Sequence, residues 1–157
     1  FQFLIIYIYH MPDNIHIGIA ESQSDIRKAL DIRFQVFVDE QNVPKDLEQD
    51  GLDKECLHFL AFADEQPVGT GRLREIDTDT VKIERMAVLK NYRNLGIGRQ
   101  MLDRMLEYIH SAGYKNTILH AQEKAADFYQ RAGFQPRGDK FYEADIPHLK
   151  MVKRVRG

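Results

Sequence analysis

Two glycines stand one residue apart in the segment VLKNYRNLGIGRQML, residues 88–102. Apolar residues follow them at helical spacing, so Gly96 and Gly98 lie where an amphipathic helix must begin. Glycine in a helix costs backbone entropy, which calls for a reason. A glycine turn between a strand and a helix presents free backbone N–H groups and the positive end of the helix dipole, and both attract phosphate oxygens. Arg93 would add a charge-assisted contact.

Two familiar phosphate-binding motifs fit this turn poorly. A P-loop requires Lys and then Ser or Thr after its last glycine, whereas Gly98 is followed by Arg99 and Gln100. A dinucleotide-binding turn requires a third glycine or alanine, where this chain has Met101. The turn taken alone therefore indicates either an anion site of another kind or a tight turn without a ligand.

The residues around the turn resemble motif A of the GNAT acyl-CoA N-acyltransferases. In that motif R-x-x-G-x-G follows a strand, as Arg93–Gly98 follows IERMAV here. Downstream, Ala125–Phe134 match the second family motif, A-x-x-F-Y-x-x-x-G-F, in the family's order. The resemblance covers about Ile15–Arg154, and the segments VFVDEQNVP and DIPHLKM are similar to a bacterial branch of small acetyltransferases.

The resemblance implies acetyl-CoA as co-substrate and assigns residues to it. The pyrophosphate would lie over the glycine turn, where side chains at Gly96 and Gly98 would obstruct it. The pantetheine arm would pair with the preceding strand, and its thioester oxygen would accept an N–H near Ala87 or Val88. Gln122 stands where many members have an asparagine, and it keeps the side-chain amide with one more methylene group. The predicted coenzyme-binding residues are Met86, Ala87, Val88, Arg93, Asn94, Leu95, Gly96, Ile97, Gly98, Arg99 and Gln122.

The resemblance also implies a general acid. Tyr129 occupies the position from which the family protonates the thiolate leaving group, a step with a modest expected benefit. The alternative is a core aromatic, because Phe128 and Tyr129 lie among residues of one helix face.

The base that takes the proton of the amine has three candidates. Strand alternation places Glu84 on the same face as Met86 and Val88, beside the expected thioester. Its alternative is a strand glutamate paired with a nearby arginine. His120 and His148 have suitable ordinary pKa values, although a lone strand histidine is more often structural.

The acceptor is expected to be a primary amine of a small molecule or peptide, attacking the thioester directly in a ternary complex. Residues 39–55 carry seven acids against two lysines, and this excess would favour a cationic amine. IERMAV is similar to the IExxAV pattern of glucosamine-6-phosphate N-acetyltransferases, which makes an amino sugar the second candidate. A coenzyme-binding module with little or no catalysis is the third.

The elements that must position these residues follow from local patterns. Strands are expected at 15–20, 58–63, 68–76, 81–88, 117–121 and near the C-terminal HLKMVKR. Helices are expected at 23–37, capped by Ser22 and burying Ile26, Leu30, Phe34 and Phe37, at 98–112, and around Tyr129. The expected fold class is α+β (or α/β), with a GNAT-like mixed, mostly antiparallel central sheet flanked by helices.

Composition restricts the remaining possibilities. We interpret residues 11–157 as a single domain and residues 1–10 as an extension outside it, too short to span a membrane. A net charge of −2 argues against nucleic-acid binding. Cys56 is the single cysteine, so no internal disulfide forms and a cytoplasmic location is expected. No zinc-binding spacing occurs, so no metal is expected. Family dimers are common, which leaves a homodimer open.

Overall fold

The computed structural model describes residues 11–155, so the interpretation of residues 1–10 lies outside the described part of the chain. These residues form one mixed sheet in the order β1-β2-β3-β4-β5-β8-β6, with β7 also paired to β8. The strands are β1 (Ile15–Ile19), β2 (Leu57–Ala63), β3 (Gln66–Glu75), β4 (Thr80–Val88), β5 (Asn116–Gln122), β6 (Gln135–Pro136), β7 (Phe141–Glu143) and β8 (Ile146–Arg154).

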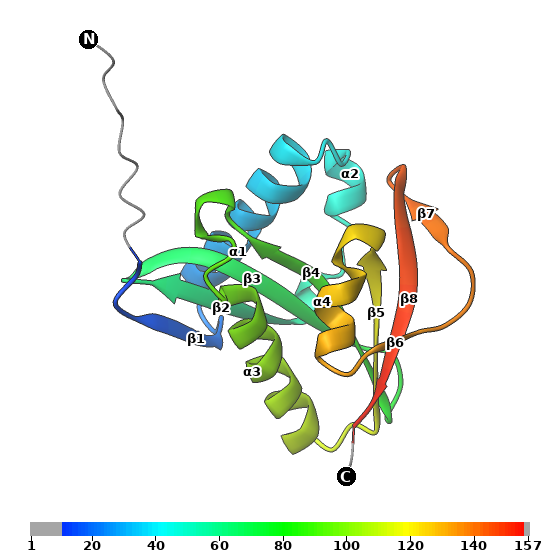
Figure 1. Cartoon of the computed structure of the whole chain (residues 1–157). Helices are drawn as coiled ribbons and strands as arrows, with labels where there is room; N and C mark the ends of the chain where they lie inside the picture. Colours follow the sequence, from blue (N-terminus) through cyan, green and yellow to red (C-terminus); the bar gives the residue numbers. More distant parts are fainter. Residues whose placement is uncertain (1–10, 156–157) are drawn as a thin grey trace.

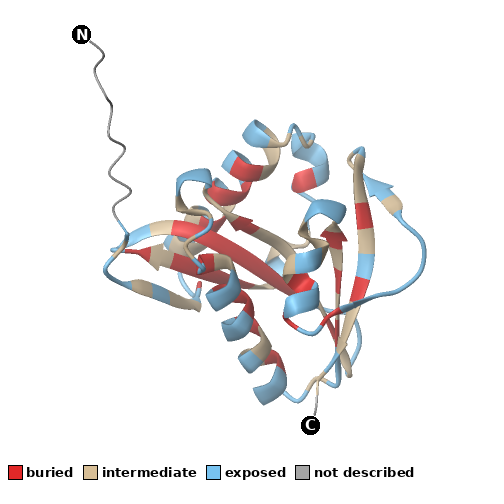
Figure 2. Ribbon diagram, viewed as in Figure 1, coloured by how far each residue is buried: buried red, intermediate tan, exposed pale blue. Residues whose placement is uncertain are grey.

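The helices cover both faces of this sheet, as Figure 1 shows. They are α1 (Gln23–Arg33), η1 (Phe34–Glu40), α2 (Lys45–Glu48), η2 (Asp53–Glu55), η3 (Lys90–Tyr92), α3 (Ile97–Ser111), η4 (Glu123–Ala125) and α4 (Ala126–Arg131). One hydrophobic cluster joins α3 and α4 to the sheet, and a second, smaller cluster lies under α1. The central strands are therefore buried along much of their length (Figure 2). Within residues 11–155, every helix is too short or too polar to cross a membrane.

The sheet is antiparallel except where α3 connects β4 to β5, which pair in parallel. Hairpins account for the antiparallel neighbours β2–β3 and β7–β8. Their tight turns are formed by Asp64–Glu65 and by Ala144–Asp145, all four with positive φ. The expected α+β fold with a mostly antiparallel sheet is confirmed.

The first helix differs from its prediction in register and in form. Ser22 caps it as expected, with its hydroxyl accepting the N–H of Asp25 at 3.0 Å. The buried stripe, however, is formed by Ala29, Ile32, Arg33 and Val36, whereas Phe34 is exposed. Of the predicted face, Ile26 and Phe37 pack against the cluster beneath the helix, but the most buried positions are taken by smaller apolar residues and a paired arginine. The helix then continues as the π-helix η1, a form that is common at functional sites.

Candidate active site

The predicted coenzyme residues meet where β4 and β5 separate. The two strands pair only from Thr80 opposite Asn116 to Ile83 opposite Leu119. Beyond that point β4 continues to Val88 on β3, and β5 continues to Gln122 on β8. No strand of the described chain fills the fork between them. The backbone edge of β4 at Met86, Ala87 and Val88 thus faces the fork without a strand partner, as the pantetheine assignment requires.

A β-bulge lies in β4 at the base of this fork. Arg85 has φ of +56°, and the register with β3 shifts between the pair Arg72–Glu84 and the pair Thr70–Ala87. Simple alternation therefore fails here. Glu84 shares a face with Ala87, not with Met86 and Val88, which pack with the core on the α3 side. The predicted facing of Glu84 was wrong because the bulge inserts one residue into the strand.

The turn after β4 leads directly into α3. Asn94 and Gly96 both have positive φ, of 63° and 80°. Gly96 is the N-cap residue of α3, and no side chain caps this helix. The first N–H groups of a helix have no partner within it. The N–H groups of Ile97, Gly98 and Arg99 therefore donate no hydrogen bond to a capping side chain. Unpaired N–H groups at the start of a helix are suited to bind an anion.

The two glycines of the turn differ in why a side chain is absent. At Gly96 the backbone conformation itself favours glycine, while an added Cβ would meet only open space and the amide of Gln100 at 4.0 Å. At Gly98 φ is not positive, and an added Cβ would lie at ordinary distances of 3.7 Å from Phe128 and 3.8 Å from Val88. The fold thus leaves the glycine at position 98 without a structural reason, and close approach of a ligand would supply one.

Two polar bridges cross the fork from the end of η1. The Arg93 guanidinium donates to both carboxylate oxygens of Glu40, from Nη1 at 2.6 Å and from Nη2 at 2.7 Å. The Arg93 Nε donates to the Val88 carbonyl at 2.9 Å. On the other arm, the Gln122 side-chain amide donates to Gln41 at 2.8 Å. Sequence reasoning missed Glu40 and Gln41, because contacts so distant along the chain leave no local signal.

Glu84 lies in a buried cluster of charges. Its carboxylate contacts Arg72 at 2.6 Å, Arg74 at 2.9 Å and Lys82 at 3.3 Å, and its side chain is 7 % exposed. Although burial raises its pKa, the hydrogen bonds and charges of these cations prevail and lower the pKa to about 2. Glu84 is therefore a strand glutamate paired with nearby arginines, as the alternative interpretation expected. Its role as a base stays a prediction.

The acidic segment 39–55 is held against the sheet by arginines. Arg33 pairs with Glu48 and Asp53, and Arg72 pairs with Asp50 and Asp53. With Glu40 on Arg93, four of the seven acids in this segment form ion pairs with arginine. Most of its negative charge is thus neutralised internally. The expectation that this charge attracts a cationic amine loses much of its basis.

The two histidine candidates share one carboxylate beyond the base of the fork. His120 Nδ1 lies 2.9 Å from Glu143 on β7, and His148 Nε2 lies 3.9 Å from the same carboxylate. The Lys82 ammonium lies 3.3 Å from His120 Nδ1. The His120 ring also packs edge-on against Phe141, at 4.9 Å between centroids. The segment FYEADI is evident in the sequence, but its contact with the histidines was missed because the pairing of β7 with β8 creates it.

Tyr129 is buried between aromatic rings. It is 8 % exposed and packs edge-to-face with Phe128 and Phe134, at 5.0 and 6.0 Å between ring centroids. Burial raises the pKa of its phenol, so the hydroxyl keeps its proton at neutral pH. The ring thus belongs to the core, as the structural alternative expected, and general-acid catalysis by its hydroxyl stays a prediction.

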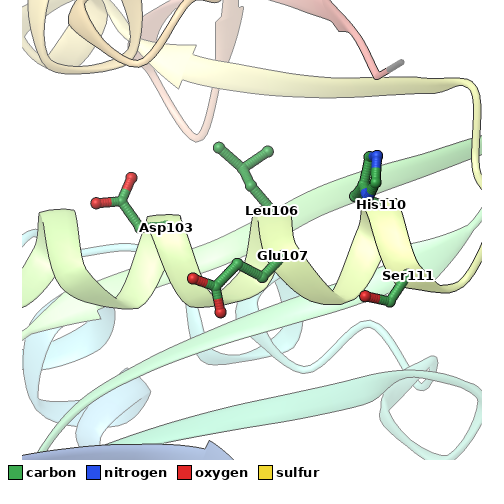
Figure 3. Close-up of a pocket in the computed structure, with 5 residues that line it drawn as sticks. All are labelled: Asp103, Leu106, Glu107, His110 and Ser111. Carbon is green, nitrogen blue, oxygen red and sulfur yellow. The ribbon is translucent and has the colours of Figure 1, made fainter. Parts of the chain in front are cut away.

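Two hollows on the described surface bear on the location of the site. One, of about 330 Å³, lies beside the fork and is lined by Glu40, Gln41, Gln122, Glu123, Lys124, Ile146 and Pro147. The other, of about 540 Å³, follows the outer side of α3 (Figure 3) and is lined by Asp103, Leu106, Glu107, His110 and Ser111. The second contains none of the predicted site residues. Among residues 11–155, His, Cys, Asp and Glu form no cluster suited to a metal ion.

This chain is similar to a known protein family and to two proteins of Bacillus subtilis. The family model described as an acetyltransferase (GNAT) domain matches residues 19–155. The uncharacterized protein YyaT of Bacillus subtilis is 39 % identical over 137 residues, covering 85 % of this chain and 92 % of YyaT. The uncharacterized N-acetyltransferase YjcF of the same organism is 38 % identical, covering 86 % of this chain and 96 % of YjcF.

Solved structures share the same fold. An acyl-CoA N-acyltransferase of Pseudomonas aeruginosa superposes with a TM-score of 0.78 at 28 % identity, over 89 % of this chain and 98 % of that one. A GNAT family acetyltransferase of Elizabethkingia anophelis, solved with acetyl-CoA bound, superposes with a TM-score of 0.72 over 91 % of this chain and 99 % of that one. At 18 % identity the second likeness concerns the fold.

Proposed function

The chain belongs to the GNAT family of acetyltransferases, and on that premise we propose that it transfers the acetyl group of acetyl-CoA to a primary amine at the fork between β4 and β5. The observation that carries this proposal is the fork itself, with an uncapped helix beginning at the glycine turn on its rim. Chemically, this arrangement offers an extended backbone edge for the pantetheine and N–H groups for the pyrophosphate.

The donor side of the site would use backbone groups for most of its contacts. The N–H groups of Ile97, Gly98 and Arg99 would bind the pyrophosphate, with Arg93 beside them. Met86, Ala87 and Val88 would pair with the pantetheine, and an N–H near Ala87 would stabilise negative charge on the thioester oxygen. The open space at Gly96 supports this assignment, since the protein itself does not fill the position beside that residue, whereas an added Cβ at Gly98 would already contact Phe128 and Val88.

The proton of the attacking amine has a better acceptor in His120 than in Glu84. Glu84 is held ionised by three cations, and a carboxylate so stabilised is a weak proton acceptor. His120 Nδ1 lies 2.9 Å from the Glu143 carboxylate and 3.3 Å from the Lys82 ammonium, so the carboxylate is the closer neighbour. In the tautomer that donates its Nδ1 proton to Glu143, the lone pair of the ring lies on Nε2, where it would accept the proton of the amine. Tyr129 would return a proton to the departing thiolate.

The proposal is tested by binding and turnover in parallel. Calorimetry should show binding of acetyl-CoA, and thiol release should follow with at least one member of a panel of polyamines, amino acids, peptide lysines and glucosamine-6-phosphate. Absence of coenzyme binding would refute the donor assignment. Binding without thiol release for any amine would instead support the coenzyme-binding module named among the alternatives.

A further inference from the structure

The end of η1 stands across the fork that the coenzyme would enter. Glu40 is bound to Arg93 after β4, and the next residue, Gln41, is bound to Gln122 at the end of β5. Arg93 and Gln122 are both among the residues assigned to the coenzyme, and they lie at the ends of the two arms of the fork. Both are therefore engaged by one dipeptide in the free protein.

The contact between Glu40 and Arg93 has the geometry of anion recognition. Each carboxylate oxygen accepts from a different terminal nitrogen of the guanidinium, at 2.6 and 2.7 Å. A phosphate group uses the same two-point pairing with arginine. The third nitrogen, Nε, already donates to the Val88 carbonyl and fixes the orientation of the group. A phosphate that reached Arg93 would meet a guanidinium whose paired donors are occupied.

We propose that Glu40 competes with the phosphates of the coenzyme for Arg93, and so sets the affinity of the protein for its donor. This inference rests on the proposed function, because it needs the coenzyme to bind at the turn. Arg93 lowers the pKa of Glu40, which keeps the carboxylate ionised at neutral pH. The competitor is therefore present under the conditions in which the enzyme would work.

Displacement of Glu40 would also affect the hollow beside the fork. Glu40 and Gln41 line the hollow of about 330 Å³ beside the fork, together with Gln122. Gln41 is tied to the π-helix through its N–H, which donates to the Val36 carbonyl at 3.1 Å. Because Glu40 and Gln41 are adjacent and both line the hollow, displacement of Glu40 by a bound donor would change the wall of this hollow.

The test compares coenzyme A with pantetheine, which lacks the phosphates, by calorimetry. Glu40→Gln should bind coenzyme A about two- to fivefold more tightly than the parent, the range expected for release of a partly exposed ion pair. Affinity for pantetheine should not change. Glu123→Gln is the matched control, because Glu123 lines the same hollow but pairs with Lys140 at 2.9 Å. It should alter coenzyme affinity less than about twofold.

A second arm isolates Arg93. In an Arg93→Gln background, Glu40→Gln should give no gain, because the group in competition is gone. Equal or weaker coenzyme binding by Glu40→Gln would overturn the proposal and make Glu40 a residue that orients Arg93 for the phosphate. A gain that persists without Arg93, or that extends to pantetheine, would overturn it as well. Failure of the parent protein to bind coenzyme A would refute the proposed function itself, a result distinct from these.

Discussion

At the scale of single residues, the two glycines of the turn have separate explanations. Gly96 needs its left-handed backbone conformation, whatever binds above it. Gly98 has an ordinary helical conformation with room for a Cβ. Glycine at this position therefore lowers the stability of the helix, and nothing in the fold requires it. The second glycine is therefore the sharper indicator of a ligand. Stability and binding should separate at this position.

Gly98→Ala is expected to leave the free energy of unfolding within about 1 kcal/mol of the parent, since the added methyl group makes ordinary contacts. Coenzyme A should bind at least about tenfold more weakly, because the methyl group stands where the phosphates approach. Urea unfolding and calorimetry measure the two effects. Gly96→Ala is the comparison, with a loss of stability of about 1 kcal/mol from its positive φ. Unchanged coenzyme affinity in Gly98→Ala would contradict the donor assignment.

Tyr129→Phe tests the general acid without disturbing the core. The ring keeps its edge-to-face contacts with Phe128 and Phe134, so the fold should be retained. Loss of the hydroxyl should lower kcat by about tenfold while the Kd for coenzyme A stays the same. Thiol release with a competent amine gives the rate. If the kcat of the variant equalled that of the parent, Tyr129 would have a structural role alone.

At the scale of elements, one buried cluster of charges fastens the segment after α1 to β3 and β4. Arg72 is fully buried and joins Asp50 and Asp53 of that segment to Glu84 of β4. Arg85, at the bulge, reaches back to the carbonyl oxygens of Leu47 and Glu48. The cluster therefore holds the bulge and the acidic segment in one arrangement, and the bulge fixes which residues of β4 face the fork.

Glu84→Gln should destabilise the protein by about 3 kcal/mol at pH 7, because it leaves buried cations without a full counter-charge. The pKa of Glu84 is lowered from its usual value to about 2 in the folded protein. Its contribution is therefore complete above the usual carboxyl pKa and is lost as the pH falls through about 2. The difference between the two proteins should narrow from pH 7 to pH 3 in urea unfolding.

The control for this measurement is Glu107→Gln. Glu107 forms an exposed pair with Arg104 at 3.2 Å on α3, which should contribute less than about 1 kcal/mol at any pH. If Glu84→Gln lost no more stability than this control, the cluster would not fasten the bulge. Loss of turnover with stability intact would instead favour Glu84 as the base.

At the scale of the whole molecule, the site exists because the sheet divides. Residues separated by 53 positions, Glu40 and Arg93, and by 81 positions, Gln41 and Gln122, come into contact across the division. The helix α3 connects the two arms and delivers its N-terminus to the rim. Donor and acceptor would therefore meet inside the sheet of residues 11–155, where two neighbouring strands separate and leave backbone groups without a strand partner.

Much of this architecture could be predicted from local patterns. Period-two alternation predicted the main strands, apolar spacing predicted α3, and Ser22 marked the start of α1. The short β6 was missed, because two residues give no periodic signal. The buried face of α1 and η1 was predicted in part: Ile26 and Phe37 pack on the cluster beneath, whereas Phe34 is exposed, since the sheet selects which residues fit.

The sequence by itself determined the family, the fold class and the position of the glycine turn, because these depend on motifs and on hydrophobic periodicity. Only the tertiary structure decided which face Glu84 occupies, which cations surround it, and that Glu40 holds Arg93. The physical reason is the same in each case. A bulge changes the direction of every later side chain in its strand, and an ion pair depends on distance in space, which the order of residues along the chain does not encode.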